Sequence, residues 1–108
     1  MWENLTMSLD VAVVGSCNLD LVVTVDAIPL VGQTVLGGDL AQIPGGKGAN
    51  QAVATSRLGH SVAFIGRIGD DDNGKFLKQC LREDNVETSF LFETQGVPSG
   101  IALISVQA

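Results

Sequence analysis

One glycine-rich stretch constrains the fold more than any other part of this sequence: PGGKGANQAVATSRLG, residues 44–59. Three of its first five residues are glycine, and they surround Lys47 before a helix-like segment rich in small residues. Glycine lets a backbone come close to a ligand because it has no Cβ, and a helix start offers unpaired N–H groups and partial positive charge. With Lys47 and Asn50 in that first turn, the stretch predicts a cradle for a small polar ligand. The alternative is a turn that only begins a helix and leaves Lys47 exposed.

The segments on either side of this stretch predict an α/β fold. The apolar run at residues 11–15 is typical of a strand buried on both faces in a central parallel sheet. A helix over residues 47–58 and a second buried strand over residues 62–65 complete a β–α–β unit with it. A further helix is expected to end near residue 84. The run Asp70-Asp71-Asp72 caps that helix and complements its dipole, with a metal cluster as the less favoured interpretation.

Residues 19–43 predict a small antiparallel sheet that stands off the main body. Short strands are expected near residues 19–25, 34–36 and 39–43, with glycine turns between them. Residues 88–92 and 101–106 are two more strand candidates, and the turn-rich link between them suggests a hairpin.

Two polar side chains follow the first strand directly, at the position where open α/β sheets place their ligands. Asn18 and Asp20 are two residues apart, so they project to the same side of an extended segment. An aspartate accepts hydrogen bonds and an asparagine can donate or accept, which suits the vicinal hydroxyls of a polyol. An Asx-turn at the strand end is the alternative.

Composition narrows the class of protein. The 108 residues include 12 acidic and 6 basic side chains, a net charge of −6, which opposes unspecific binding to nucleic acid or to anionic membranes. The two cysteines form no disulfide framework, and residues 1–9 read as an N-terminal extension with neither signal peptide nor membrane span. A cytoplasmic protein is expected. The lysine turn is not a Walker A loop, because Gly48 stands where that motif needs Ser or Thr.

Four segments, in this order, resemble the ribokinase/PfkB family of carbohydrate kinases: VVGSCNLDLV, PGGKGANQAVATSRLG, FIGRIGDDDNG and SGIALISV. The resemblance is closest to ribokinases. It implies an incomplete, Rossmann-like three-layer α/β/α domain over residues 10–108 with a small β-sheet lid, formed by strands within 19–43, 88–92 and 101–106. It also implies a homodimer that pairs through the lid strands. The implied sugar-binding residues are Asn18, Asp20, Gly46, Lys47 and Asn50, with Leu19, Gly48 and Ala49 in the same contact segments.

The resemblance further implies a reaction that these residues do not complete. A ribokinase transfers the γ-phosphate of ATP to the 5-hydroxyl of D-ribose, with Mg²⁺ and a monovalent cation such as K⁺. The family's nucleotide pocket, anion hole and catalytic base lie in a C-terminal half that the sequence lacks, so no catalytic residue and no metal ligand are expected here. The 108 residues alone are therefore expected to be inactive. Two alternatives stay open: a non-catalytic module that binds a pentose or pairs through its lid strands, and a kinase for fructose, deoxyribose or a nucleoside.

Overall fold

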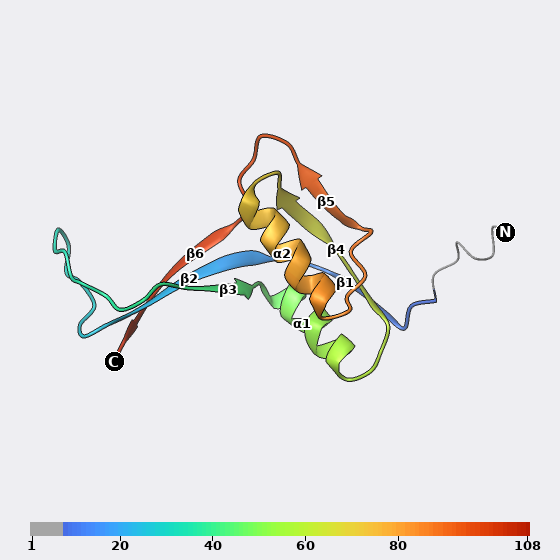
Figure 1. Ribbon diagram of the computed structural model, residues 1–108, viewed down its shortest axis with the longest axis horizontal. Coiled ribbons are helices and arrows are strands. Elements are labelled where there is room, and N and C mark those ends of the chain that lie inside the picture. The colour runs from blue at the N-terminus through green and yellow to red at the C-terminus, as the bar shows by residue number, and fades with distance from the viewer. Residues whose placement is uncertain (1–7) are drawn as a thin grey trace.

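The computed structural model describes residues 8–108, so the predicted extension at residues 1–9 lies outside the described residues except for its last two. The elements in chain order are β1 (Val11–Val14), β2 (Asn18–Val25), β3 (Ala41–Gly45), α1 (Lys47–Arg57), β4 (Val62–Gly69), α2 (Asp72–Glu83), β5 (Leu91–Thr94) and β6 (Ile101–Gln107). They form two separate three-stranded sheets in an elongated molecule of 62 × 34 × 19 Å (Figure 1). Within residues 8–108, no helix is long and apolar enough to cross a membrane.

The central sheet has the strand order β1-β4-β5, and all of its strands are parallel. Helices α1 and α2 are the crossovers between consecutive strands of this sheet, which is the arrangement expected of right-handed β–α–β units. Small residues on α1 allow a close approach: Ala52 is fully buried and belongs to the same core cluster as Phe64 of β4 and Leu77 of α2. The described residues thus supply a sheet and one covering helical layer.

The second sheet, which we call the lid sheet, has the order β3-β2-β6 and extends away from the helices, as Figure 1 shows. Strand β2 pairs with β3 in antiparallel fashion and with β6 in parallel. The lid sheet is therefore mixed, whereas residues 19–43 alone had suggested an antiparallel one. The predicted strand at 34–36 does not form; only an isolated bridge joins Val25 to Gly37.

The assignment of residues 88–92 to the lid is wrong. The strand there is β5, which begins at Leu91 and pairs in parallel with β4 in the central sheet. Helix α2 returns the chain to the side of β4, and the amide of Glu87 already bonds to the Val62 carbonyl at 2.9 Å. The turn-rich residues 95–100 consequently do not close a hairpin. They carry the chain from the central sheet to the lid sheet.

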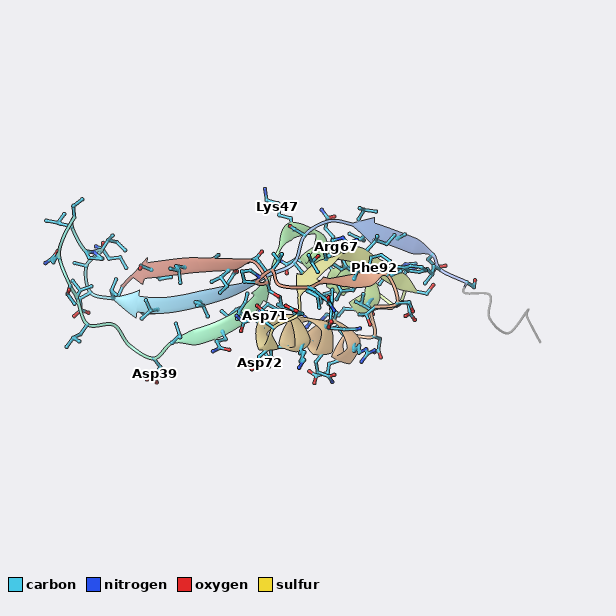
Figure 2. All side chains as sticks on the ribbon, turned by 90° about the horizontal axis from the view of Figure 1, so that it is seen from above. Asp39, Lys47, Arg67, Asp71, Asp72 and Phe92 are labelled. Atoms are coloured by element: carbon cyan, nitrogen blue, oxygen red, sulfur yellow. The ribbon has the colours of Figure 1, made fainter. Side chains whose placement is uncertain are left out.

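Strand β1 is also less buried than its apolar sequence predicts. It lies at the edge of the central sheet, and 77% of Val14 is exposed on the face that no described helix covers. Arg67 and Phe92, both exposed, stack on one another with 5.6 Å from the guanidinium carbon to the ring centroid (Figure 2). Strand β1 is therefore buried on one face, whereas the sequence predicted burial on both faces.

Candidate functional site

Asn18 and Asp20 open strand β2, and their side chains contact each other. The side-chain nitrogen of Asn18 donates to Oδ1 of Asp20 at 2.5 Å, so the two do project to the same side. Both are half-buried. Strand β3 runs beside them, with Asn18 opposite Gly45 in the antiparallel register. A side chain at Gly45 would bring its Cβ to 2.6 Å from Oδ2 of Asp20, so glycine leaves room for this carboxylate.

The glycines of the turn bring the start of α1 onto the end of β1. Gly46 has φ 103° and ψ 131°, a conformation that disfavours any residue with a Cβ, and it serves as the N-cap without a side-chain bond. Gly48 packs on Gly15, where a Cβ on Gly48 would lie 2.9 Å from the Gly15 Cα. The amide of Ala49 also bonds to the Ser16 carbonyl at 3.2 Å. The turn is therefore held against the segment that leads into Asn18.

The first turn of α1 presents two polar side chains that have no partner among the described residues. Lys47 and Asn50 are exposed, and neither side chain makes a hydrogen bond or ion pair within residues 8–108. Figure 2 shows Lys47 pointing out from the body of the molecule. The first backbone N–H groups of the helix are directed to the same end, because a helix leaves its initial amides without internal partners. Hydroxyl or anionic oxygens would suit this end of α1.

The other three predicted site residues, Leu19, Gly48 and Ala49, are buried. Leu19 is 1% exposed and Ala49 is 6% exposed, and both side chains belong to the hydrophobic core cluster. Gly48 is buried against Gly15. Any ligand contact at these three positions would therefore come from backbone atoms.

A cavity of about 280 Å³ lies next to this region, between α1, α2 and the end of β3. Its lining includes Asn50 and Gly45 but is otherwise mainly apolar, and Asn18, Asp20 and Lys47 do not contribute to it. Arg57 and Asp84 at its border form an ion pair, with Nε to Oδ1 at 2.9 Å. The cavity thus shares Asn50 with the polar site, by which we mean Asn18, Asp20, Lys47 and Asn50, but it is otherwise mainly apolar.

The sequence and the two-sheet architecture have counterparts in known proteins. Residues 8–108 match the model of the pfkB family carbohydrate kinases. The chain belongs to the pfkB family of carbohydrate kinases. It is 45% identical to the ribokinase of Bacillus subtilis over 95 residues, which are 88% of this chain and 32% of that protein. It is 46% identical to the ribokinase of Lactococcus lactis over 100 residues, 89% of this chain and 32% of the relative.

A solved structure of Arabidopsis thaliana ribokinase, complexed with ribose and ATP, superposes with a TM-score of 0.83 at 32% identity. The match covers 94% of this chain and 33% of that one. The chain therefore spans about a third of the length of the family members it matches. The partial α/β fold with a lid agrees with this family membership.

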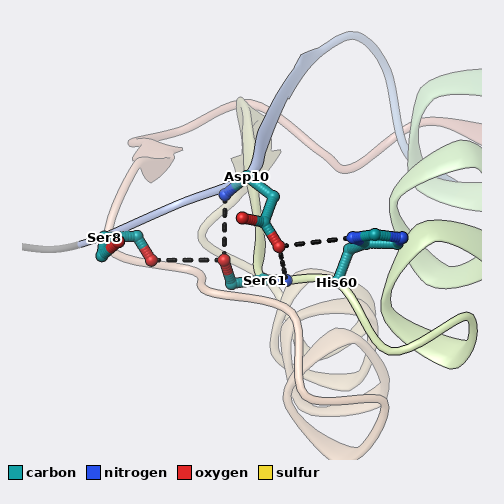
Figure 3. A network of polar contacts seen from close by, with 4 residues as sticks. All are labelled: Ser8, Asp10, His60 and Ser61. Atoms are coloured by element: carbon teal, nitrogen blue, oxygen red, sulfur yellow. Dashed lines mark hydrogen bonds and ion pairs between the residues drawn. The ribbon is translucent and has the colours of Figure 1, made fainter.

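A second polar cluster, at the start of β1, brings together a serine, a histidine and an aspartate (Figure 3). The Asp10 carboxylate accepts from the Ser61 amide at 3.1 Å and lies 3.3 Å from Nδ1 of His60. The Ser61 amide and the imidazole together lower the pKa of Asp10. However, the Ser61 hydroxyl donates to the Ser8 carbonyl and accepts from the Asp10 amide, so it is not activated by the histidine. The cluster ties β1 to the α1–β4 loop and is no catalytic triad.

The acidic run at residues 70–72 does cap α2. Asp71 is the N-cap and accepts from the Gly74 amide at 2.9 Å. The same carboxylate also accepts from the hydroxyl and amide of Ser99, at 2.6 and 2.9 Å. These bonds, led by the Ser99 hydroxyl, hold the pKa of Asp71 at about 2. Sequence reasoning missed Ser99, because no local pattern links it to a helix 28 residues earlier.

Proposed function

We propose that residues 8–108 form the sugar-binding part of an ATP-dependent ribokinase, which phosphorylates the 5-hydroxyl of D-ribose. One juxtaposition supports this proposal above the others. The Asn18–Asp20 pair faces Gly45 across the lid sheet, and the open first turn of α1 begins two residues beyond that glycine. A carboxylate, two amide side chains and an ammonium group around one turn offer both acceptors and donors to a polyhydroxylated ligand.

Each polar residue has a role in this proposal. Asp20 accepts hydrogen bonds from sugar hydroxyls, and its bond from Asn18 fixes its orientation. Lys47 and Asn50 donate to hydroxyl oxygens from the helix side, together with the backbone N–H groups at the start of α1. The backbone that positions these groups includes Leu19, Gly48 and Ala49. Asp20 binds substrate and is not the base that deprotonates it.

ATP and its metal ions do not fit the described residues. Residues 8–108 contain no group of three or more His, Cys, Asp or Glu side chains arranged to hold a metal ion. The cavity beside α1 and α2 is mainly apolar, and its arginine is paired with Asp84. A triphosphate needs several cations or metal ions around it. We therefore assign ATP, Mg²⁺ and K⁺ to polypeptide outside these residues, and we expect residues 8–108 alone to be inactive.

Two further features belong to the same proposal. The lid sheet exposes apolar side chains on both of its edge strands, Ile43 on β3 and Leu103 on β6, which supports pairing of lids in a homodimer.

Cys17 and Cys80 are both free thiols, which favours a reducing, cytoplasmic setting.

Ribose binding by the native polypeptide, expressed from its complete coding sequence, tests the proposed function. Calorimetry should give saturable binding of D-ribose, and Asp20→Asn should weaken it about tenfold to a hundredfold, because the carboxylate loses charged hydrogen bonds. Asp39→Asn is the matched control, because this substitution removes the same charge from an exposed position just before β3. Transfer of phosphate from ATP to ribose should accompany binding. Stronger binding of fructose, deoxyribose or a nucleoside would reassign the substrate, and no binding of any of them would refute a sugar site.

A further inference from the structure

The Asp71 carboxylate joins the start of α2 to Ser99, which lies 28 residues further along the chain. It caps α2 through the Gly74 amide, and it grips Ser99 through both the hydroxyl and the amide of that residue. The Ser99 hydroxyl in turn accepts from the Gly69 amide at the end of β4, at 2.9 Å. Ser99 is 5% exposed. A helix cap alone would need only the first of these bonds.

This junction lies where the chain leaves the central sheet for the lid sheet. Figure 2 shows Asp71 at the end of α2 that faces the lid sheet, while Asp72 points away from it. The junction has no spare room, because a Cβ on Gly74 would come within 2.9 Å of the Ser99 hydroxyl, and one on Gly69 within 2.6 Å of the Ser99 amide. Ser99 is therefore held by packing as well as by hydrogen bonds.

The residue after Ser99 contacts the sugar-binding strand directly. The Gly100 carbonyl accepts from the Leu19 amide at 2.9 Å, and Leu19 stands between Asn18 and Asp20. From there β6 continues in parallel register with β2, with Leu19 opposite Ile101 and Asp20 opposite Ala102. A Cβ on Gly100 would lie 3.4 Å from the Asn18 Cβ. The bond that fixes the Asn18–Asp20 backbone thus comes from the residue directly after Ser99.

We propose that Asp71 is a positioning residue for the sugar site: through Ser99 and Gly100 it sets the place of the β2 segment that carries Asn18 and Asp20. The inference rests on the proposed function for its effect on sugar binding, but the mechanical link from Asp71 to Leu19 stands without it. Asp71 touches no sugar in this proposal. Its carboxylate stays ionised near neutral pH, which keeps all three of its bonds strong.

Two variants of the native polypeptide separate this role from simple stabilisation of α2. Asp71→Asn weakens the three bonds that the Asp71 carboxylate accepts, and Ser99→Ala removes the hydroxyl while leaving the Gly74 cap in place. Asp72→Asn is the matched control, because Asp72 lies next to Asp71 in the first turn of α2 and is exposed. Should Asp71→Asn fail to fold, Ser99→Ala decides the question.

Both test variants should raise the dissociation constant for D-ribose by roughly three- to thirtyfold. They should also speed hydrogen exchange at the Leu19 amide, with little change at the Phe64 amide in the central sheet. Asp72→Asn should change neither. Loss of thermal stability with unchanged ribose affinity and unchanged Leu19 exchange would overturn the proposal. If the wild-type protein binds no sugar, the proposed function fails, and the exchange of Leu19 still decides whether Asp71 positions β2.

Discussion

Replacing Gly46 by alanine should damage the turn that carries the proposed sugar site, and Gly59→Ala provides a matched control. Both glycines have positive φ, 103° at Gly46 and 92° at Gly59, so alanine meets backbone strain at each position. They differ in their surroundings. A Cβ at Gly46 would overlap the Ser16 carbonyl and lie 2.8 Å from the Cys17 Cα, whereas a Cβ at Gly59 meets nothing within 4 Å.

The structure gives the size of the difference. Strain at positive φ alone costs about 1–2 kcal/mol, which is the loss expected for Gly59→Ala. Gly46→Ala adds an overlap with backbone atoms that cannot rotate away, worth about 1–3 kcal/mol more. Its total loss in the free energy of unfolding should therefore be roughly 2–5 kcal/mol.

Urea titration of the native polypeptide, followed by far-ultraviolet circular dichroism, measures both losses. Ribose affinity should fall in Gly46→Ala under conditions where the variant is still folded, because the turn moves away from Ser16 and Asn18. In Gly59→Ala it should stay unchanged, since that turn lies at the other end of α1. Equal losses of stability in the two variants would refute the close packing of the glycine turn on residues 16–17.

Three further predictions concern the core, the junction and the ion pair. Phe64→Ala should cost about 3–5 kcal/mol of unfolding free energy, because Phe64 is fully buried, and Phe76→Ala, at a 39% exposed position, should cost much less in the same urea titration. Equal costs would contradict the described core. Asp71 has its pKa lowered to about 2 from 3.8, so its contribution to stability is complete above about pH 4 and is lost as pH falls toward 2, where the unfolded state takes up the proton first. As the pH is lowered, the melting temperature should therefore fall less steeply in Asp71→Asn than in the wild type. Parallel curves of melting temperature against pH would contradict the Ser99 bonds. Arg57→Gln should leave ribose affinity unchanged and alter stability only slightly, since 69% of the Arg57 side chain is exposed and such ion pairs are weak; a large loss of ribose binding would place the sugar in the cavity beside α1 and α2.

Local sequence patterns predicted those parts of the fold that depend on neighbouring residues. The helix expected at 47–58 is α1 at Lys47–Arg57, because a glycine turn precedes it and Gly59 follows it. Capping by the acidic run is confirmed at Asp71. The contact between Asn18 and Asp20 also follows from their spacing of two on a strand.

Local sequence patterns did not predict the features that depend on residues distant in the chain. Strand β5 (Leu91–Thr94) pairs with β4 rather than with the lid sheet because α2 returns the chain beside β4, and nothing local at Leu91 specifies the choice. Strand β6 runs parallel to β2 for a similar reason, since its direction is set by where residues 95–100 cross between the sheets. The bond from Ser99 to Asp71, 28 residues away, belongs to the same class of long-range contact.

The claim that Asn18, Asp20, Lys47 and Asn50 bind a sugar is tested most directly by nuclear magnetic resonance. We would titrate D-ribose into the isotope-labelled native polypeptide and follow the backbone amides and the side-chain amides of Asn18 and Asn50. Saturable shifts confined to residues 18–20 and 46–50 within the described part of the chain are the predicted result. Shifts centred on Arg57 and Cys80 instead, or no shift at residues 18–20 and 46–50 in a protein that phosphorylates ribose, would contradict the assignment of the site.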